Sequence, residues 1–226
     1  MQDPVFVKDA FAKVARRYVI TNHVLSLGTD ILWRRKVARM VAETKPQRLL
    51  DLATGTGDLA LEISRACPGL NITGADFSAP MLDYARGRKV PGLTLVEADA
   101  MALPFASESY DCLTVAFGLR NMERWGDAVW EMARVTRKGG SLLVLDFSLP
   151  TALALRPAYR FYLHRVLPRV AGFITRQQDA YSYLAGSIEK FPSGEEMCDL
   201  IRANGFSTAR AVPVSMGIAT IYHAVK

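Results

Sequence analysis

Short apolar segments alternate with stretches of helical spacing through the middle of the chain. The segment over 141–147 is an unbroken apolar run, which is typical of a strand covered on both faces. The expected strands are residues 48–53, 70–75, 93–97, 110–117 and 141–147. The expected helices between them are residues 58–67, 78–88 and 125–137, the last ending at Lys138-Gly139-Gly140. Strands that alternate with helices at this spacing predict an α/β fold with a parallel sheet and right-handed crossovers.

Three stretches depart from this alternation. Residues 8–43 have helical spacing in which charged residues interrupt the apolar positions. Residues 150–192 are rich in aromatic and basic side chains. The tail over 207–225 predicts two strands with Gly217 between them, and such a hairpin closes one edge of a sheet.

Two helix starts carry capping signals. Ser78 is the expected N-cap of one helix. A second helix over 193–203 is expected to open with a capping box of Ser193 and Glu196, and Gly205 falls just past its end.

Length and composition indicate one globular domain with helical additions. The chain has 226 residues, of which 50% are apolar and 22% are charged. We expect an N-terminal helical lid over 1–46 and a main domain over 47–226 with a helical insert at 150–192. No apolar run reaches the roughly 18 residues of a membrane-spanning helix. The first 20 residues lack the apolar core of a secretory signal, so the expected compartment is the cytoplasm.

Cysteine, histidine and charge restrict the function only loosely. The three cysteines and three histidines have no ligand spacing, so neither a disulfide framework nor a metal site is expected. The net charge of +6 suits a nucleic acid, an anionic membrane surface or simply a basic exterior. The basic residues are spread along the chain and no nucleic-acid motif occurs, so we expect no nucleic-acid partner.

The main candidate site is a glycine bend after the first expected strand. Asp51 ends that strand, Gly55 and Gly57 form the bend, and Asp76 ends the next strand. The pattern fits both a dinucleotide fingerprint and an S-adenosylmethionine (SAM) site. The carboxylates of Asp51 and Asp58 would repel a pyrophosphate, whereas SAM carries a sulfonium and an ammonium. The charges therefore favour SAM, with Asp51 facing its ammonium and the glycines allowing close backbone approach.

Further expected cofactor contacts follow later strands. Asp76 is expected to accept hydrogen bonds from the ribose hydroxyls, since ligands in open α/β sheets bind at the carboxyl ends of strands. Asp99 follows the third strand, where it would accept from the adenine amine while the N–H of Ala100 reaches a ring nitrogen. Leu103 and Phe105 could wall the adenine or simply belong to the core. Singly, each acid could also be a solvated turn residue or a helix cap.

Taken together, the chain resembles the bacterial ubiquinone/menaquinone biosynthesis C-methyltransferase family over nearly its whole length. The motifs DLATGTGDLAL (51–61) and ADAMALPF (98–105) occur in many SAM methyltransferases. More specific are FGLRN (117–121), VLDFS (144–148) and YLAGSI (183–188) followed by Phe191-Pro192. Five N-terminal residues also fall at the family's spacing: Tyr18, Asn22, Ser26, Gly28 and Trp33. The resemblance implies a Rossmann-like class I SAM methyltransferase fold, with a mostly parallel seven-stranded sheet, helices on both faces and an antiparallel C-terminal strand.

The resemblance also implies cofactor contacts at Thr56, Asp76, Asp99 and Ala100. Ala116 stands where the family usually has serine, so a side-chain contact is lost there. The N-terminal segment departs more, and this affects the identity of the acceptor more than the reaction. The departures are Val19, Thr21 and the pair Asp30-Ile31.

The reaction implied by the resemblance is C-methylation of a polyprenylated quinol ring, with demethylmenaquinol to menaquinol as the first hypothesis. Arg120 and Asn121 are the candidate catalytic residues. Because arginine stays protonated, it would stabilise the phenolate or order a water, and Asn121 would orient that water. Alternatively, Arg120 caps a helix or pairs with an acid. His164 and His23 are weaker candidates for a base.

Several alternatives remain at this point. The acceptor could be a benzoquinol of ubiquinone biosynthesis or another small molecule, and an NAD-binding oxidoreductase is a different class. The basic, aromatic run over 156–169 suits peripheral contact with an anionic membrane, on the cytoplasmic face, or alternatively an ordinary amphipathic helix packed on the sheet. A homodimer is also considered.

Overall fold

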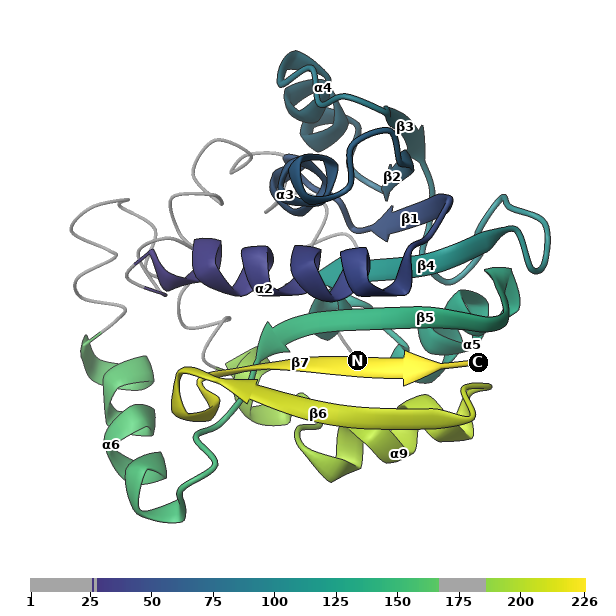
Figure 1. Ribbon diagram of the computed structural model, residues 1–226. Coiled ribbons are helices and arrows are strands. Elements are labelled where there is room, and N and C mark those ends of the chain that lie inside the picture. The colour runs from purple at the N-terminus through teal and green to yellow at the C-terminus, as the bar shows by residue number, and fades with distance from the viewer. Residues whose placement is uncertain (1–25, 27, 167–185) are drawn as a thin grey trace.

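The computed structural model describes Ser26, residues 28–166 and residues 186–226. Its strands form one seven-stranded sheet in the order β3-β2-β1-β4-β5-β7-β6 (Figure 1). The strands are β1 (Arg48–Leu52), β2 (Asn71–Asp76), β3 (Leu93–Glu97), β4 (Tyr110–Ala116), β5 (Thr136–Phe147), β6 (Thr208–Val214) and β7 (Ala219–Val225).

The pairing confirms the predicted topology. Strands β1 to β5 run parallel to one another, and β7 runs antiparallel to both β5 and β6. The two C-terminal strands form the predicted hairpin, with β7 inserted beside β5 and β6 at the edge. The strand order reverses between β1 and β4, and in open α/β sheets ligands bind at such a point, outside the carboxyl ends of the strands.

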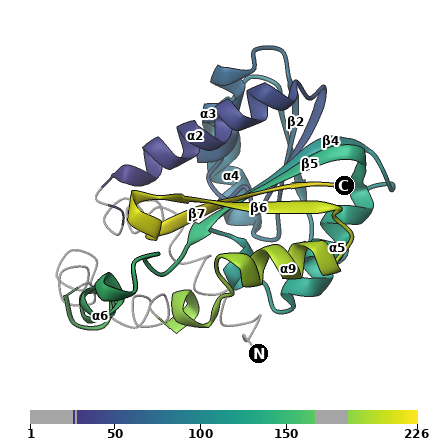
Figure 2. The same ribbon diagram turned by 60° about the horizontal axis from the view of Figure 1, so that its bottom comes forward.

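The helices cover both faces of this sheet. Figure 2 shows α2 and α3 on one side of the sheet, and α5 and α9 on the other. The helices are α2 (Thr29–Thr44), α3 (Asp58–Ala66), α4 (Ala79–Gly87), α5 (Trp125–Val135), α6 (Arg156–Phe161) and α9 (Glu195–Ala203). Short turns of other helical types are η1 (Leu119–Asn121), η2 (Leu153–Leu155), η3 (Tyr162–Val166) and η4 (Ser215–Gly217).

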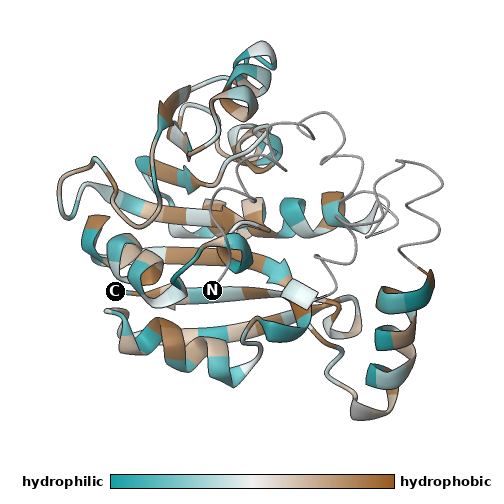
Figure 3. Cartoon of the chain, turned by 180° about the vertical axis from the view of Figure 1, so that it is seen from behind, coloured by the Kyte–Doolittle hydropathy of each residue, from teal (hydrophilic) through white to brown (hydrophobic). Residues whose placement is uncertain are grey.

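Alternation along the strands builds the two cores. In β5, Leu143 and Leu145 belong to the core beneath α2 and α3, whereas Leu142 and Val144 belong to the core beneath α5 and α9. All four side chains are fully buried, and each such burial contributes about 1.5–3 kcal/mol. Figure 3 shows hydrophobic residues along the central strands and helices of mixed character. The strand covered on both faces is therefore confirmed.

Helix α2 joins the same core. Trp33, Val37 and Val41 recur at four-residue spacing and are at most 4% exposed, so they form a continuous buried stripe. The helix ends at Thr44, and the residues that flank it, Gly28 and Lys45, are both in the left-handed conformation. Helical structure predicted before residue 26 lies outside the described residues. The boundary at residue 46 between a lid and a main domain stays a prediction.

One predicted boundary is wrong. Helix α5 ends at Val135, and β5 begins at once with Thr136 rather than at Ser141. Tyr110 of β4 pairs with Thr136 and Cys112 pairs with Ser141, so the four residues 137–140 of β5 lie opposite the single residue Asp111 of β4. Gly139 and Gly140 therefore belong to this irregular part of β5 and do not end a helix. Glycine is needed at position 140 because a Cβ there would lie only 2.9 Å from the Asp111 carbonyl oxygen.

The two predicted capping interactions are also absent. Ser78 occupies the N-cap position of α4, but its side chain makes no capping hydrogen bond. Helix α9 begins at Glu195 with Gly194 as its N-cap, so Ser193 lies one residue too early for the capping box. Gly194 has a positive φ and its N–H donates to the Tyr222 hydroxyl at 3.1 Å, so a tertiary contact sets this helix start.

Candidate active site

Asp51 lies at the end of β1 and is held by two hydroxyl groups. Its Oδ1 accepts a hydrogen bond from Thr114 of the adjacent β4 at 2.6 Å, and its Oδ2 accepts one from Thr54 at 2.7 Å. Asp51 and Thr114 are direct neighbours in the β1–β4 register, so both point to the same face of the sheet. The side chain is buried, and no basic residue of the described chain forms an ion pair with it.

This environment raises the pKa of Asp51 from 3.8 to about 6. Desolvation by burial is the main cause, and the hydrogen bonds from Thr114 and Thr54 oppose it. Arg34 lowers the pKa through its positive charge, and Asp76 raises it through its negative charge. A buried carboxylate with only neutral hydrogen-bond partners is suited to a cationic ligand.

The glycine bend connects β1 to the end of β2. The N–H of Gly55 donates to Asp76 Oδ2 at 2.8 Å, and the N–H of Ser78 donates to Asp76 Oδ1 at 2.9 Å. Gly55 and Gly57 both have positive φ, a conformation that other residues rarely adopt. Asp76 is buried, which raises its pKa against the effect of these N–H donors. The structure thus brings together the predicted group Asp51, Gly55, Gly57 and Asp76.

The loops after β1 and β4 touch each other beside this bend. Ala53 and Phe117, which follow the two strands, both have positive φ although neither is glycine. A Cβ on Gly118 would lie only 2.5 Å from the Ala53 Cβ, so this contact requires glycine. Strained backbone of this kind gathers at functional sites, and sequence patterns gave no sign of it at Ala53 or Phe117.

Thr56 and Asp58 are engaged in contacts of their own. The Thr56 hydroxyl donates to Asp58 Oδ2 at 2.6 Å, and Asp58 forms an ion pair with Arg88 at 2.6 Å. The charge of Asp58 is therefore largely balanced. Discrimination against a pyrophosphate then depends on Asp51 rather than on both acids as the sequence suggested.

Asp99 and Ala100 lie in a tight turn after β3. Asp99 is exposed and its Oδ1 accepts from the N–H of Met101 at 2.9 Å, while the Asp99 carbonyl accepts from Ala102 at 3.1 Å. Leu103 is buried in the core and Phe105 packs edge-on against Tyr110. The predicted contacts of Asp99 and Ala100 with adenine stay predictions.

Arg120 forms a buried ion pair. It lies in η1, its Nη1 donates to Asp146 Oδ1 at 2.6 Å and to the Phe117 carbonyl at 2.8 Å, and only 1% of the residue is exposed. This is the pairing with an acid that the sequence left open. Asn121 donates to the same carbonyl at 3.2 Å. Burial raises the pKa of Asp146, and the nearby guanidinium opposes this effect.

Three aromatic rings pack around this ion pair. Phe117 and Phe147 lie 4.8 Å apart between ring centroids, and Trp33 of α2 packs against both at 6.3 and 5.9 Å. The Arg120 guanidinium lies 5.3 Å from the Phe147 centroid. Tyr159 of α6 is also packed against this core. The carboxyl ends of β4 and β5 are thus lined by aromatic groups, and those of β1 and β2 by acids.

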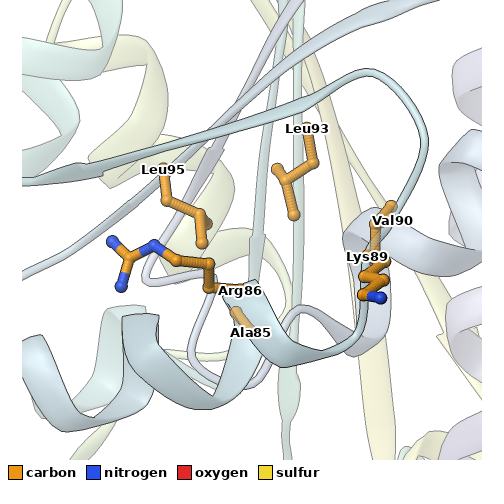
Figure 4. A pocket seen from close by; sticks show the side chains of 6 residues that line it. All are labelled: Ala85, Arg86, Lys89, Val90, Leu93 and Leu95. Carbon is orange, nitrogen blue, oxygen red and sulfur yellow. The ribbon is translucent and has the colours of Figure 1, made fainter.

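Other residues considered as bases or ligands do not join this group. His164 is half exposed, and its Nε2 lies 3.2 Å from the Glu189 carboxylate. A pocket between the end of α4 and β3 is lined by aliphatic and basic side chains, and none of the predicted site residues lines it (Figure 4). Several residues quoted for the family resemblance or as candidates lie outside the described residues: Tyr18, Val19, Thr21, Asn22, His23, Tyr183, Leu184 and Ala185.

Comparison with known proteins decides the family. Residues 2–226 match the model of the ubiE/COQ5 methyltransferase family. The chain belongs to this family. It is thus a SAM-dependent methyltransferase, and the alternative of an NAD-binding oxidoreductase is wrong.

Individual relatives match nearly the full length of the chain. A protein of Thermus thermophilus named demethylmenaquinone methyltransferase is 43% identical over 215 residues, which is 94% of this chain and 97% of that protein. A protein of Bdellovibrio bacteriovorus named ubiquinone/menaquinone biosynthesis C-methyltransferase UbiE is 39% identical and covers 97% of this chain and 95% of its own length.

A solved structure confirms the class I methyltransferase fold. It is a SAM-dependent methyltransferase of Thermotoga maritima, described as a possible histamine N-methyltransferase. It superposes with a TM-score of 0.69 at 19% identity and covers 96% of this chain and 98% of its own. At this identity the likeness concerns the fold alone.

Proposed function

We propose that this methyltransferase transfers the SAM methyl group to a ring carbon of a polyprenylated quinol, converting demethylmenaquinol to menaquinol. The observation that carries the proposal is the 43% identity, over nearly both full chains, to a protein named demethylmenaquinone methyltransferase. The Bdellovibrio relative's name includes ubiquinone as well, so a benzoquinol is the second candidate acceptor.

The acid-lined half of the carboxyl edge fits the cofactor. Asp51 offers a buried carboxylate without an ion-pair partner in the described chain, which suits the ammonium of SAM. Asp76 accepts backbone N–H groups from Gly55, Ser78 and Phe77, and the carboxylate keeps a remaining lone pair for a ribose hydroxyl. When bound, SAM supplies an electrophilic methyl group on a sulfonium. Thr56, Gly55, Gly57, Asp99 and Ala100 complete the proposed cofactor contacts.

The aromatic half suits the acceptor ring. Trp33, Phe117 and Phe147 are at most 4% exposed and form a buried apolar wall beside the cofactor half, which excludes water from this edge. A ring carbon becomes nucleophilic when the neighbouring hydroxyl loses its proton, so the quinol rather than the quinone is the proposed acceptor. We assign to Arg120 the stabilisation of that phenolate charge, directly or through a water oriented by Asn121.

The ion pair with Asp146 fixes where the Arg120 charge lies. Because Asp146 and the Phe117 carbonyl both hold its Nη1, the guanidinium has one defined position beside the aromatic rings. Near-normal turnover of a folded Arg120→Ala variant with intact SAM binding would remove this role.

Product analysis tests the substrate. The protein is incubated with methyl-labelled SAM and with reduced naphthoquinols or benzoquinols that carry the same prenyl chain, and the labelled product is identified. We expect label on the naphthoquinol ring carbon and none with the oxidised quinone. Label only on the benzoquinol would select the ubiquinone reaction, and label on neither would point to another small molecule.

We also propose peripheral contact with an anionic membrane. Of the eight large hydrophobic side chains found exposed in the described chain, six lie on α2, η2, η3, η4 and α6, near the carboxyl ends of the central strands (Figure 1): Ile31, Leu32, Leu155, Phe161, Val166 and Met216. Arg156, Arg160 and Arg165 lie among them on α6 and η3. This mixture of apolar and basic groups is typical of interfacial segments.

Flotation with liposomes tests this contact. We expect the protein to float with phosphatidylglycerol-containing liposomes at low salt and to float less with neutral ones. Absence of flotation at low salt would remove the membrane proposal without affecting the reaction. No helix among the described residues is long and apolar enough to cross a bilayer. Cytoplasmic location and a homodimer stay predictions.

A further inference from the structure

Arg34 is a buried cation on the face of α2 that covers the site. Its guanidinium lies 5.2 Å from the centroid of the Phe117 ring, which follows β4 at the carboxyl edge. Only two basic residues of the described chain are buried, Arg34 and Arg120. A buried charge is costly unless it has a partner or a ligand, so both positions call for a physical reason.

The two arginines differ in how far their partners engage them. Arg120 is fixed by Asp146 and the Phe117 carbonyl, with 2% of its side chain exposed. Arg34 keeps 8% exposure and donates through Nη1 alone, to Asp30. Its Nε and Nη2 form no hydrogen bond with any described residue, so several of its five N–H donors remain available.

Asp30 orients the Arg34 side chain. It lies one helical turn earlier in α2, is fully buried, and accepts a hydrogen bond from Ser26 at 2.7 Å. A carboxylate held in this way fixes one edge of the guanidinium and leaves the other edge to bind a second group.

Arg34 lies on the side of the sheet to which the proposed cofactor residue Asp51 points. Arg34 is close enough to Asp51 for its charge to lower the pKa of that carboxyl group. Leu49, two residues before Asp51 in β1, shares the core with Trp33 and Val37 of α2, so Asp51 points to the face that α2 covers. A ligand bound to Asp51 would therefore lie within range of the positive charge of Arg34.

We propose that Arg34 binds the α-carboxylate of the methionine part of SAM, while Asp51 binds its ammonium. This inference rests on the proposed use of SAM. The methionine end of SAM is a zwitterion, so a site that binds only its ammonium would leave a carboxylate buried beside Asp51 without a cation. A guanidinium with two adjacent free N–H groups matches a carboxylate in geometry and charge.

Calorimetry with two ligands tests the proposal. Decarboxylated SAM keeps the ammonium, sulfonium and adenosine but lacks the carboxylate. We expect Arg34→Leu to bind SAM about 10- to 100-fold more weakly than wild type, the loss of a charge-assisted pair. Its affinity for decarboxylated SAM should change by less than about twofold. Arg35→Leu is the matched control, because Arg35 is half exposed on the same helix and pairs with Glu62 at 3.3 Å; it should change neither affinity.

The ratio of the two affinities separates the possible outcomes. A parallel loss for both ligands, or no loss for either, would overturn the inference, since Arg34 would then act on the fold or not at all. If wild type binds neither ligand, the proposed use of SAM itself fails, which is a different result.

Two further variants keep the test decisive if Arg34→Leu does not fold. Asp30→Asn combined with Arg34→Leu removes both charges, so no unpaired carboxylate remains buried, and it should show the same selective loss for SAM. Arg34→Lys keeps the charge but loses the two-pronged geometry, so its SAM affinity should fall between those of wild type and Arg34→Leu. Equal selectivity in wild type and both variants would overturn the inference.

Discussion

The two halves of the carboxyl edge hold their buried carboxylates in different ways. In the β1–β2 half, Asp51 and Asp76 accept hydrogen bonds only from hydroxyls and backbone N–H groups. In the β4–β5 half, Asp146 is paired with a cation of the protein itself, Arg120. Burial raises the pKa of all three. The carboxylates of the β1–β2 half therefore keep negative charge that a ligand can balance, whereas Arg120 already balances the carboxylate of the β4–β5 half.

From this difference we propose that the β1–β2 half binds the cation and that the β4–β5 half shapes the acceptor space. Neutral donors orient a carboxylate without cancelling its charge, so the β1–β2 half attracts a ligand that carries positive charge. An internal ion pair beside three aromatic rings fixes geometry and presents little net charge, which suits an apolar ring. The carboxyl edge of one sheet thus provides two different environments, an acidic one at β1 and β2 and an aromatic one at β4 and β5.

The largest expected effect comes from breaking the ion pair of the β4–β5 half. Arg120→Ala leaves Asp146 buried without its cation, so we expect a loss of about 3–5 kcal/mol in the free energy of unfolding. Urea unfolding at neutral pH measures it. The double variant Arg120→Met/Asp146→Asn removes both charges and should lose less than the single variant. A single variant as stable as wild type would mean that the pair does not hold this half together.

The next effect concerns the contact between the two halves. In Gly118→Ala the new methyl would lie 2.5 Å from the Ala53 Cβ, so the loops after β1 and β4 must separate. We expect a loss of about 1–3 kcal/mol in unfolding free energy, together with weaker SAM binding by calorimetry. Gly87→Ala, at the end of α4, is the control because its added Cβ meets nothing within 4 Å. Equal stability of the two variants would show that the loops are not in close contact.

A smaller effect, specific to the β1–β2 half, is a dependence of SAM binding on pH. If only ionised Asp51 binds the ammonium, a pKa of about 6 makes SAM binding about tenfold weaker at pH 5 than at pH 7. Stability changes in the opposite direction. Folded Asp51 keeps its proton to higher pH than the unfolded chain does, so its stabilising contribution is lost as pH rises from about 4 to about 6, by up to about 3 kcal/mol.

Asp51→Asn separates this effect from the other buried acids, whose pKa values are also raised. Unfolding free energy is measured with urea and SAM affinity by calorimetry, for both proteins across pH 4–7. The difference between wild type and Asp51→Asn should show the pH dependence of both quantities, since the variant has no carboxyl group to titrate at this position. A wild-type affinity for SAM that is equal at pH 5 and pH 7 would contradict the assigned role of Asp51.

Most of the fold could be predicted because its signals are local. Apolar runs, helical spacing and the glycine bend gave the five parallel strands, their helices and the C-terminal hairpin. The errors arise where a distant contact sets a boundary. The Tyr222 hydroxyl of β7 accepts a hydrogen bond from the Gly194 N–H, and α9 begins after Gly194 rather than at Ser193. Residues 137–140, expected to end a helix, belong to β5 because that strand pairs with β4 on both sides of them.

The site was predictable only in part, for the same reason. Asp51, Gly55 and Asp76 lie close together because consecutive strand ends must meet at one edge, and the sequence shows that order. Thr114 becomes a partner of Asp51 only through the β1–β4 register, and Arg34 reaches this edge only because α2 packs across the sheet. A buried acid in an apolar strand is itself a signal to look for such donors on the neighbouring strand.

The smallest expected effect concerns Ser78, which lies beside Asp76 in the β1–β2 half. An N-cap serine that uses its hydroxyl loses about 1 kcal/mol when changed to alanine. Here the Ser78 hydroxyl is buried and forms no hydrogen bond in the described chain, while its backbone N–H holds Asp76 and survives the change. Ser78→Ala should therefore alter the unfolding free energy by less than about 0.5 kcal/mol, or increase it, because an unsatisfied buried hydroxyl is removed. A loss of 1 kcal/mol or more in urea unfolding would restore the cap that the sequence suggested.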